Sequence, residues 1–438
     1  MVGSRSVLDL LIHHANLPDG RKDVSIAVKD GKIVEVSAKP IEAEANRKID
    51  AAGQLASPAF VDSHFHLDAA LSLGQPRFNE SGTLLEGIAI WGEHKAIMTV
   101  DSIKQRARSL CHWAIARGTL AMRSHVDVCD DRLLGVEALL EIKREFAPFL
   151  DIQLVAFPQD GYLRSAGAAG NLRQALDKGV DVVGGIPHIE RTMLEGAESI
   201  RALCEIACER GTRVDMHCDE NDDPLSRHIE TLAFHAQRLG LQDRVTASHL
   251  TSMHSMDNYY VSKLLPLMAE ANIHAVANPL TNIVLQGRHD SYPKRRGLMR
   301  VKEMMAKGIN VAFGHDCVMD PWYGLGSCDM LEVAQMGLHV SHMTRRDELG
   351  KIFAAITENG ARAMGLEAYG LAPGKAADMV ILQAADPEEA IRLRSNRLFV
   401  IRRGKVISQS QPTASQLDLD GKQVKVDFQF RPEPQTGF

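Results

Sequence analysis

Asp62-Ser63-His64-Phe65-His66-Leu67 is the stretch of this sequence that decides the fold. Side chains alternate faces along a β-strand, so His64 and His66 are expected to point the same way while Phe65 points to the opposite face. The residues before them, 55–61, are mostly apolar, which is typical of a buried parallel strand. α/β barrels place their chemistry at the carboxyl ends of such strands. Two imidazoles on one face supply half of a metal site, although two solvated histidines would show the same spacing.

Apolar β-prone runs alternate with helical patterns along the middle of the chain. This alternation is the arrangement of a parallel sheet or a (β/α)8 barrel. Residues 101–117 and 258–271 are two of the helical patterns. We therefore predict the α/β class, with a TIM-like (β/α)8 barrel. The eight candidate barrel strands are residues 59–63, 120–126, 152–157, 180–186, 213–217, 245–249, 273–277 and 309–313.

Both ends of the chain are rich in short β-prone runs. Residues 8–11, 24–28 and 32–36 surround Asp30-Gly31, which is a strong hairpin signal, and residues 379–382, 398–401 and 406–407 repeat the pattern. We predict that the two ends pair into one small β-sandwich with the barrel inserted between them; unrelated β caps are the alternative. The expected domains are residues 1–57 and 369–438 for the sandwich and residues 58–368 for the metal-dependent barrel, with a loose tail from Pro412 onward.

Composition narrows the class of function. The chain has 438 residues, 45% of them hydrophobic and 24% charged, as in ordinary globular enzymes. Its net charge of −6 gives no basic field, so we expect a small molecule as partner and no nucleic-acid polymer. No apolar run is long enough for a membrane span, and residues 1–20 lack the apolar core of a signal peptide, so we expect no membrane and a cytoplasmic location. Seven cysteines without a repeating spacing fit reduced thiols in that compartment.

Five polar residues follow the predicted strands in the way that an α/β barrel active site requires: His64, His66, His217, His249 and Asp316. Imidazole and carboxylate ligands suit one divalent ion, Zn²⁺ or Fe²⁺, with a position left open for water. Such an ion lowers the pKa of bound water to about 7, which yields hydroxide near neutral pH. Glu220, three residues beyond His217, is placed to carry a proton from that water to a leaving amine. A solvated loop acid is the alternative interpretation of Glu220.

Longer motifs carry a family resemblance over nearly the whole chain. They include Val126-Asp127-Val128, Val155-Ala156-Phe157-Pro158-Gln159, Gly185-Ile186-Pro187-His188, Thr246-Ala247-Ser248-His249 and the stretch 313–322. In these motifs the sequence resembles the amidohydrolase superfamily, and within it the barrel-type bacterial cytosine deaminases. The resemblance implies a hydrolase of C–N bonds in cyclic amidines, one that converts free cytosine or 5-methylcytosine to uracil or thymine plus ammonia. It also implies pyrimidine salvage and a homo-oligomer.

The resemblance implies a role for each site residue. His64, His66, His217 and Asp316 would hold the metal, and the metal-activated hydroxide, oriented by His249, would attack C4 of the ring. Asp316 would also accept the proton of the attacking water, and Glu220 would protonate N3. Three further positions would bind the substrate: Gln159 at the O2 side, the backbone at Leu84 at the N1 side, and Trp322 packed near the pocket. An amide such as that of Gln159 offers the donor and acceptor that a lactam-like edge needs, although it could equally cap the third strand.

Two absences favour one metal and deamination. Many hydrolases of the superfamily bridge two metals through a lysine at the end of the fourth strand, whereas residues 180–186 lead here into Pro187-His188. The Cys-x-x-Cys signature of the other zinc deaminases is also missing. For His125 and His188, near other strand ends, we expect structural or supporting roles, because a lone histidine near a core is more often part of the scaffold than a ligand.

Cys317 departs from the family pattern, which has a second aspartate directly after the metal-binding one. By the resemblance, this side chain would border the ring edge near C4 and C5. A thiol is smaller and less polar than a hydrated carboxylate, so it would leave room for a substituent there. We therefore predict a preference for 5-methylcytosine; a neutral exchange in an ordinary cytosine deaminase is the alternative. Two other hypotheses stay open: a deaminase of another aminated ring, such as isoguanine or an aminotriazine, and a non-catalytic ligand-binding homologue. The second would have lost at least one metal or proton-transfer residue, and all six are present.

Overall fold

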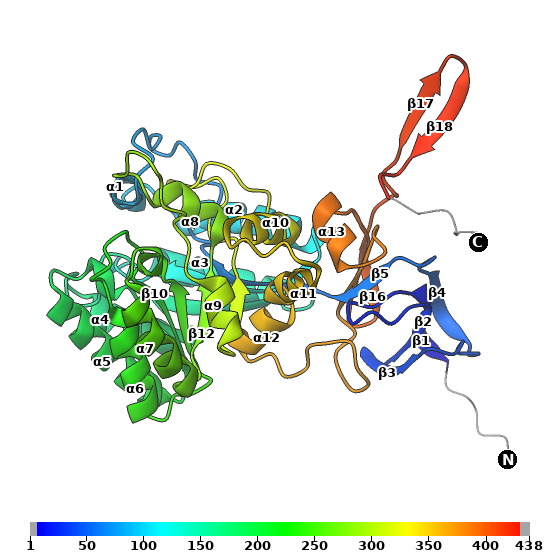
Figure 1. Cartoon of the computed structure of the whole chain (residues 1–438). Coiled ribbons are helices and arrows are strands. Elements are labelled where there is room, and N and C mark those ends of the chain that lie inside the picture. Colours follow the sequence, from blue (N-terminus) through cyan, green and yellow to red (C-terminus); the bar gives the residue numbers. More distant parts are fainter. Residues whose placement is uncertain (1–6, 430–438) are drawn as a thin grey trace. The chain divides into compact units, whose positions relative to one another are not determined.

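The computed structural model describes residues 7–429, and the chain divides into two compact units. The larger unit runs from Phe60 to Tyr369. The smaller unit combines the chain up to Ala59 with the chain from Gly370 onward. Each unit therefore contains its own set of sheets and helices (Figure 1).

The larger unit is built on eight parallel strands that neighbour one another in sequence order. Every strand residue except two near the start of β8 and one at the start of β10 is buried, because helices cover the outer face while side chains fill the interior. The predicted (β/α)8 barrel is confirmed. The strands are β6 (Phe60–Phe65), β7 (Thr119–Asp127), β8 (Asp151–Phe157), β9 (Val182–Gly185), β10 (Arg213–Cys218), β11 (Val245–His249), β12 (His274–Ala277) and β13 (Val311–Phe313).

The barrel closes between its first and last strands through the backbone of one residue beyond β13. The Asp316 N–H donates to the carbonyl of His64 at 2.9 Å, and the His66 N–H donates to the carbonyl of Asp316 at 3.2 Å. The hydroxyl of Ser63 donates to the carbonyl of Phe313 at 3.1 Å. Asp316 is thereby fixed between the two histidines of the first strand.

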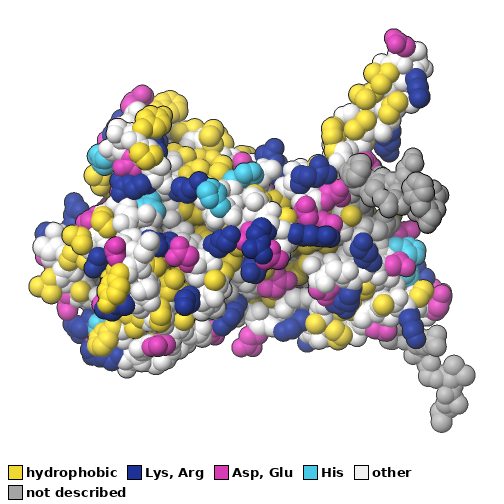
Figure 2. Space-filling view, viewed as in Figure 1, with side chains coloured by type: hydrophobic (Ala, Val, Ile, Leu, Met, Phe, Trp, Pro, Cys, Tyr) yellow, Lys and Arg dark blue, Asp and Glu magenta, His cyan; other side chains and the backbone are white. Residues whose placement is uncertain are grey.

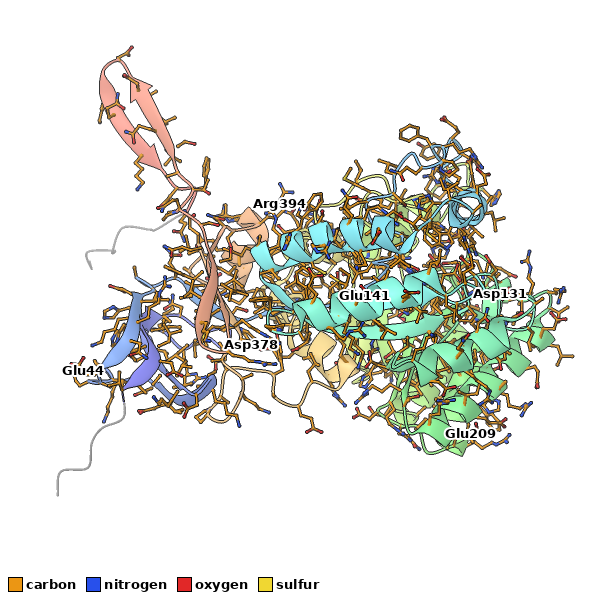
Figure 3. The ribbon with its side chains drawn as sticks, turned by 180° about the vertical axis from the view of Figure 1, so that it is seen from behind. Glu44, Asp131, Glu141, Glu209, Asp378 and Arg394 are labelled. Atoms are coloured by element: carbon orange, nitrogen blue, oxygen red, sulfur yellow. The ribbon has the colours of Figure 1, made fainter. Side chains whose placement is uncertain are left out.

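Helices follow the strands and surround the barrel (Figure 1). Ion pairs join successive helices at the surface, such as Lys104 to Glu141 at 2.5 Å and Arg173 to Glu209 at 3.4 Å. Figure 3 shows Glu141 and Glu209 on the outer helices. The helices are α1 (Leu84–Lys95), α2 (Val100–Ala116), α3 (Leu134–Phe146), α4 (Ala168–Asp177), α5 (Met193–Arg210), α6 (His228–Arg238), α7 (Asn258–Glu270), α8 (Pro279–Leu285), α9 (Val301–Ala306), α10 (Met330–Val340), α11 (Arg346–Ala355) and α12 (Glu358–Met364), with short 3-10 turns at Pro187–Ile189 and Thr251–His254.

Local sequence sets where these helices begin and end. Thr99 precedes α2, and its side-chain oxygen accepts from the Ser102 N–H. In return, the Ser102 hydroxyl oxygen accepts from the Thr99 N–H. This reciprocal cap satisfies two N–H groups that a helix start otherwise leaves open. α5 stops at Gly211, whose φ of 66° is in the left-handed region that glycine adopts without steric cost.

The smaller unit contains two four-stranded sheets that share one apolar core. One sheet has the order β3-β2-β1-β4, and the other has the order β16-β15-β14-β5. β5, from the first part of the chain, pairs antiparallel with β14, from the last part. The predicted sandwich from both ends is confirmed. Its elements are β1 (Leu8–Ala15), β2 (Val24–Lys29), β3 (Lys32–Ser37), β4 (Ala45–Asp50), β5 (Leu55–Pro58), β14 (Met379–Leu382), α13 (Pro387–Leu393), β15 (Arg397–Arg402) and β16 (Lys405–Gln409).

The expectation of a loose tail from Pro412 onward was wrong for the residues described. β17 (Ser415–Leu419) and β18 (Lys422–Val426) form an antiparallel hairpin around Asp420-Gly421. Both turn residues have positive φ, 53° and 83°, as a two-residue hairpin turn requires. The rest of the predicted tail, residues 430–438, lies outside the described residues. Among the described helices, none is both long and apolar enough to cross a bilayer.

Candidate active site

One cavity of about 290 Å³ free of protein atoms lies at the carboxyl ends of the barrel strands. Nine of the ten residues predicted for the site line it, and His64 is the exception. His64 lies in the same histidine cluster and is fully buried. The lining comes from the ends of β10 and β11, from the segments after β6, β8, β10 and β13, and from α1 and α8: His66, Leu84, Gln159, His217, Glu220, His249, Thr281, Leu285, Asp316, Cys317 and Trp322.

Three donor pairs among the four predicted metal ligands are close together, and the ligand atoms of His64, His217 and His249 all lie within 4.8 Å of one another. The Asp316 Oδ1 atom lies 3.4 Å from Nε2 of His64 and 3.4 Å from Nε2 of His66. The Nε2 atoms of His66 and His217 lie 3.1 Å apart. A tetrahedral zinc site with bonds of about 2.0–2.1 Å places its ligand atoms about 3.3–3.4 Å from one another. The observed separations are close to those edges, so this donor set fits a single divalent ion.

Burial supports the same interpretation. Removal from water is the largest effect on the pKa of His64, His66, His217 and His249, and it lowers each pKa well below its usual value. The imidazoles are therefore neutral and keep a lone pair for a metal. Neither ring nitrogen of His64 has a hydrogen-bond partner among the described residues. A buried polar atom without a partner is costly, and an ion at this point would remove that cost.

Glu220 and His249 form a pair beside the cluster. The Glu220 Oε1 atom lies 3.2 Å from Nδ1 of His249. The side-chain amide of Asn282 approaches the same nitrogen at 2.9 Å, while its oxygen accepts from the Asn278 N–H at 3.2 Å. With that orientation of the amide, Nδ1 of His249 is an acceptor, while the side-chain nitrogen of Asn278 lies 3.3 Å from both ring nitrogens. Burial, followed by the charge of Asp316, raises the pKa of Glu220 well above its usual range, which favours the neutral acid.

Four predicted substrate contacts lie around the open side of the cluster. Gln159 comes two residues after β8, and Leu84 is the first residue of α1. Gly87, one turn further along α1, lies so close to Trp322 that a Cβ there would come within 2.4 Å of the indole Cδ1. Cys317 is 3% exposed, and burial raises the pKa of its thiol well above the usual value, so it presents a neutral surface.

Sequence reasoning missed a charged layer beneath the cluster. Arg123 in β7 is fully buried and donates to Asp215 Oδ2 at 2.8 Å. The other oxygen of Asp215 accepts from Ser248 at 2.8 Å and lies 3.6 Å from Nε2 of His125. His125 also forms a second metal-compatible trio with His64 and His66. The two-residue alternation of side chains along a strand could have identified Asp215. It precedes His217 by two residues on the same strand, so the two side chains share a face.

Two further lining residues, Thr281 and Leu285, also escaped sequence analysis. Both lie in α8, a seven-residue helix that begins with Pro279. Their only signal was the Asn278-Pro279 start, because proline is favoured in the first turn of a helix. α8 also supplies Asn282 to His249, so this short helix contacts both the cavity and its proton-transfer pair.

The backbone at the site adopts unusual conformations. His249 and Asp316 have φ of 73° and 72°, a region that side-chain-bearing residues seldom occupy. Such positions cost on the order of 1–3 kcal/mol each and occur where the surroundings determine them fully. Backbone hydrogen bonds to His64 and His66 hold Asp316 directly. His249 is held through the next residue, because the N–H of Leu250 donates to the carbonyl of Cys218 at 3.0 Å.

The chain was also compared with known proteins. A model of the amidohydrolase family matches residues 47–414. The structure of 5-methylcytosine deaminase from Klebsiella pneumoniae, bound to 5-fluorocytosine, has a TM-score of 0.89 at 43% identity over 92% of this chain and 98% of that one. N-isopropylammelide isopropyl amidohydrolase from Pseudomonas sp. strain ADP is 30% identical over 91% of this chain and 97% of that protein. Pterin deaminase from Rhizobium rhizogenes is 27% identical over 91% of each.

Proposed function

This chain belongs to the amidohydrolase family, and on that premise we propose that it deaminates a free pyrimidine base, 5-methylcytosine or cytosine. Water adds at C4, the bond from C4 to the exocyclic nitrogen breaks, and thymine or uracil is released with ammonia. The observation that carries the proposal is the cavity that places Gln159, Glu220 and Cys317 around one metal-compatible cluster. The 43% identity to a 5-methylcytosine deaminase supports the choice of base.

We assign the metal to His64, His66, His217 and Asp316, because three donor pairs among them, at 3.1–3.4 Å, are spaced as in a tetrahedral site. A divalent ion bound there, Zn²⁺ or Fe²⁺, supplies a Lewis acid that makes water nucleophilic near pH 7. The protein supplies the proton transfers. Asp316 takes the proton from the attacking water. Neutral Glu220 would donate its proton to N3 of the ring, which makes C4 electrophilic. The proton taken up by Asp316 would then pass to the amino nitrogen, so that the group leaves as ammonia, and the proton of the added hydroxyl would return to Glu220 as the C4 carbonyl forms.

The remaining residues orient the reactants. We assign His249 to the attacking water, which its Nε2 would orient, since Asn282 occupies Nδ1. We assign Gln159 to the carbonyl at C2 and the backbone at Leu84 to N1, since both line the cavity and neither is among the assigned metal ligands. Trp322 forms the apolar wall, held between the cavity and α1. Cys317 faces the C5 position and leaves an apolar surface for a methyl group.

A second substrate class is favoured by a specific finding. Two relatives are named for N-isopropylammelide and for pterin, and the chain is 30% and 27% identical to them over nearly their whole lengths. The same metal cluster and proton-transfer pair could act on an amino group of another ring, such as isoguanine or an aminotriazine. The higher identity to the pyrimidine deaminase makes this the second candidate.

The test compares substrates directly. We would measure kcat/KM for ammonia release from cytosine and from 5-methylcytosine, on enzyme reconstituted with a defined metal. The ratio reports differential binding of the two transition states, and a methyl group in an apolar pocket is worth about 10- to 200-fold. A strong preference for 5-methylcytosine supports the assignment of Cys317. A strong preference for cytosine leaves a plain cytosine deaminase, and inactivity on both with metal bound points to another aminated ring.

The cellular setting is part of the proposal. A free base as substrate fits a role in pyrimidine salvage in the cytoplasm. We also propose a homo-oligomer, as expected for this family. Light scattering on the purified chain would test the oligomer.

A further inference from the structure

A second cavity lies in the larger unit, formed by residues that the proposed deamination does not use. It has about 1150 Å³ free of protein atoms, part of which is open to solvent. None of its lining residues lines the active-site cavity. The lining comes mainly from residues 294–303, which lead into α9, with His254 and Asn258 before and at the start of α7 and residues 340–342 at the end of α10.

Positive charge dominates this cavity. Its lining contains five Lys or Arg side chains and one acid, Glu303, although the chain as a whole has a net charge of −6. Figure 2 shows Lys, Arg and His side chains gathered over the region of α9 and α10. Three of the cations are paired with acids: Arg295 with Asp290 at 2.5 Å, Lys302 with Glu348 at 2.5 Å, and Arg300 with Glu303 at 3.3 Å. A positive field therefore depends on the remaining two.

Neither Lys294 nor Arg296 forms an ion pair among the described residues, although the charge of Lys294 is among the causes that lower the pKa of the nearby Asp290 carboxyl. The Lys294 ammonium donates to the carbonyls of Gly287 at 3.0 Å and Asp290 at 2.7 Å. The Arg296 guanidinium donates to the carbonyl of Val340 at 3.2 Å. Carbonyl oxygens orient a cation without neutralising its charge, and both side chains keep N–H groups to spare because an ammonium has three donors and a guanidinium five. Both residues are exposed, so a solute can reach them.

The third cation, Arg300, is held in place more firmly. Its guanidinium donates to the carbonyls of Met253 at 3.0 Å and Met256 at 2.5 Å, and it lies 3.3 Å from Glu303. Arg300 is therefore paired with an acid and has few free donors. Lys294 and Arg296 are the two groups that can bind an anion directly.

We call the four apolar residues of the lining the apolar floor of the cavity. They are Leu298, Met299 and Val301, which are 1–5% exposed, and the half-buried Val340. A bare inorganic anion gains nothing from such a surface, whereas a molecule with an apolar or aromatic part can bury it there. We propose that this cavity binds a small phosphate monoester, with the phosphate group on Lys294 and Arg296 and the organic group on the apolar floor.

Calorimetric titration tests the site with two probes, inorganic phosphate and phenyl phosphate. The test variant is Lys294→Met with Arg296→Gln, which keeps the stems of both side chains and removes both charges. The matched control is Lys178→Gln with Lys307→Gln, which removes two exposed positive charges outside the cavity. Any binding of either probe at the active-site metal is common to all three proteins, so only the difference between them reports on the cavity.

We expect the wild type and the control to bind phenyl phosphate equally. The test variant should bind it about tenfold more weakly or worse, because two charge-assisted hydrogen bonds are lost. Added salt should weaken the wild-type binding, since both cations are exposed to solvent. Phenyl phosphate should bind more tightly than inorganic phosphate.

Three results would overturn the proposal: no binding of phenyl phosphate by the wild type, wild-type affinity in the test variant, or equal affinity for the two probes. Ammonia release by the test variant, which should equal that of the wild type, verifies that it folds. If the double variant does not fold, Arg296→Gln alone is measured against Lys307→Gln alone. An unchanged affinity in Arg296→Gln then counts against the site.

Discussion

At the scale of single residues, the backbone and the side chain of Asp316 have different functions. Its backbone closes the barrel between His64 and His66, and its carboxylate lies 3.4 Å from the Nε2 atom of each of those histidines. The positive φ of 72° turns the chain so that both contacts are made at once. The position of the metal cluster therefore follows from the closure of the sheet, and a change that loosens the closure also moves a ligand.

A substitution at Glu220 tests proton transfer without changing a metal ligand. We expect Glu220→Gln to retain one metal per subunit, because the metal ligands are other residues, and to lose about 10²- to 10⁴-fold in kcat, as removal of a general acid does. The measurement is ammonia release together with metal content by mass spectrometry. His217→Ala is the contrast, since it should lose the metal. Wild-type turnover in Glu220→Gln would exclude the acid role, and loss of its metal would make Glu220 a ligand.

Cys317 is the residue on which substrate preference depends. Replacement by Asp puts a carboxylate that needs solvation where we place the C5 substituent, so kcat/KM for 5-methylcytosine should fall relative to that for cytosine by about 10- to 100-fold. Cys317→Ala is the control, because it removes the thiol but adds no charge, and it should keep the tolerance for the methyl group. The hypothesis fails if Cys317→Asp retains full activity on 5-methylcytosine.

At the scale of elements, the strands were predictable because burial and period act locally. The positions of β11 and β12, which are short and fully buried, could be predicted to within one residue. Arg123 in the middle of β7 could not be placed in the same way. A buried guanidinium is tolerated only because Asp215 pairs with it at 2.8 Å, and that partner lies 92 residues away on β10.

α8 shows a second limit of prediction from sequence. It is seven residues long, which is too short for a helical period to be recognised. Its functional contribution depends on where the barrel places it, because Thr281 and Leu285 reach the cavity and Asn282 reaches His249. Histidines and carboxylates at strand ends announce a metal site, whereas a Thr or Leu in a pocket wall carries no such signal.

Two glycines in α1, Gly87 and Gly92, allow a test of whether the contact between this helix and Trp322 shapes the cavity. A Cβ on Gly87 would meet Trp322 at 2.4 Å, whereas a Cβ on Gly92 meets nothing within 4 Å. Gly92→Ala should stabilise the protein by about 0.5–1 kcal/mol, the helix preference for Ala, and leave kcat/KM unchanged. Gly87→Ala should displace the indole and lower kcat/KM by about 10- to 100-fold. Denaturant unfolding and kinetics on both variants give the answer; equal kinetics would show that Trp322 does not shape the site.

At the scale of the whole molecule, the sequence predicted that the two chain ends pair. It did not predict which residues face each other in that pairing. β5 and β14 are both short apolar runs, and their pairing of Leu55 with Leu382 joins parts of the chain more than 300 residues apart. The hairpin of β17 and β18 was missed although Asp420-Gly421 repeats the turn signal of Asp30-Gly31, with similar φ values. Its strands are mostly exposed and therefore polar in composition, which suggested a tail. The alternation of polar and apolar residues in them was overlooked.

Metal removal is expected to change the stability of the whole chain as well as its activity. In the metal-free protein, four neutral imidazoles and the Asp316 carboxylate lie buried within one cluster, with ring nitrogens of His64 that lack partners among the described residues. An ion that binds the folded state alone stabilises it by about 2.7 kcal/mol at a free concentration of 100 times Kd. The chelated enzyme should therefore melt at a lower temperature and regain both Tm and ammonia release when Zn²⁺ or Fe²⁺ is returned.

The control for metal removal separates a site effect from a general one. His217→Ala lacks one ligand, so its Tm should respond weakly to the same additions of metal, whereas Glu220→Gln should respond as the wild type does. Calorimetric scans over a series of metal concentrations would show the difference as two slopes of Tm against the logarithm of concentration. If His217→Ala and the wild type gave the same slope, the stabilising ion would be bound elsewhere, and the assignment of His217 as a ligand would be wrong.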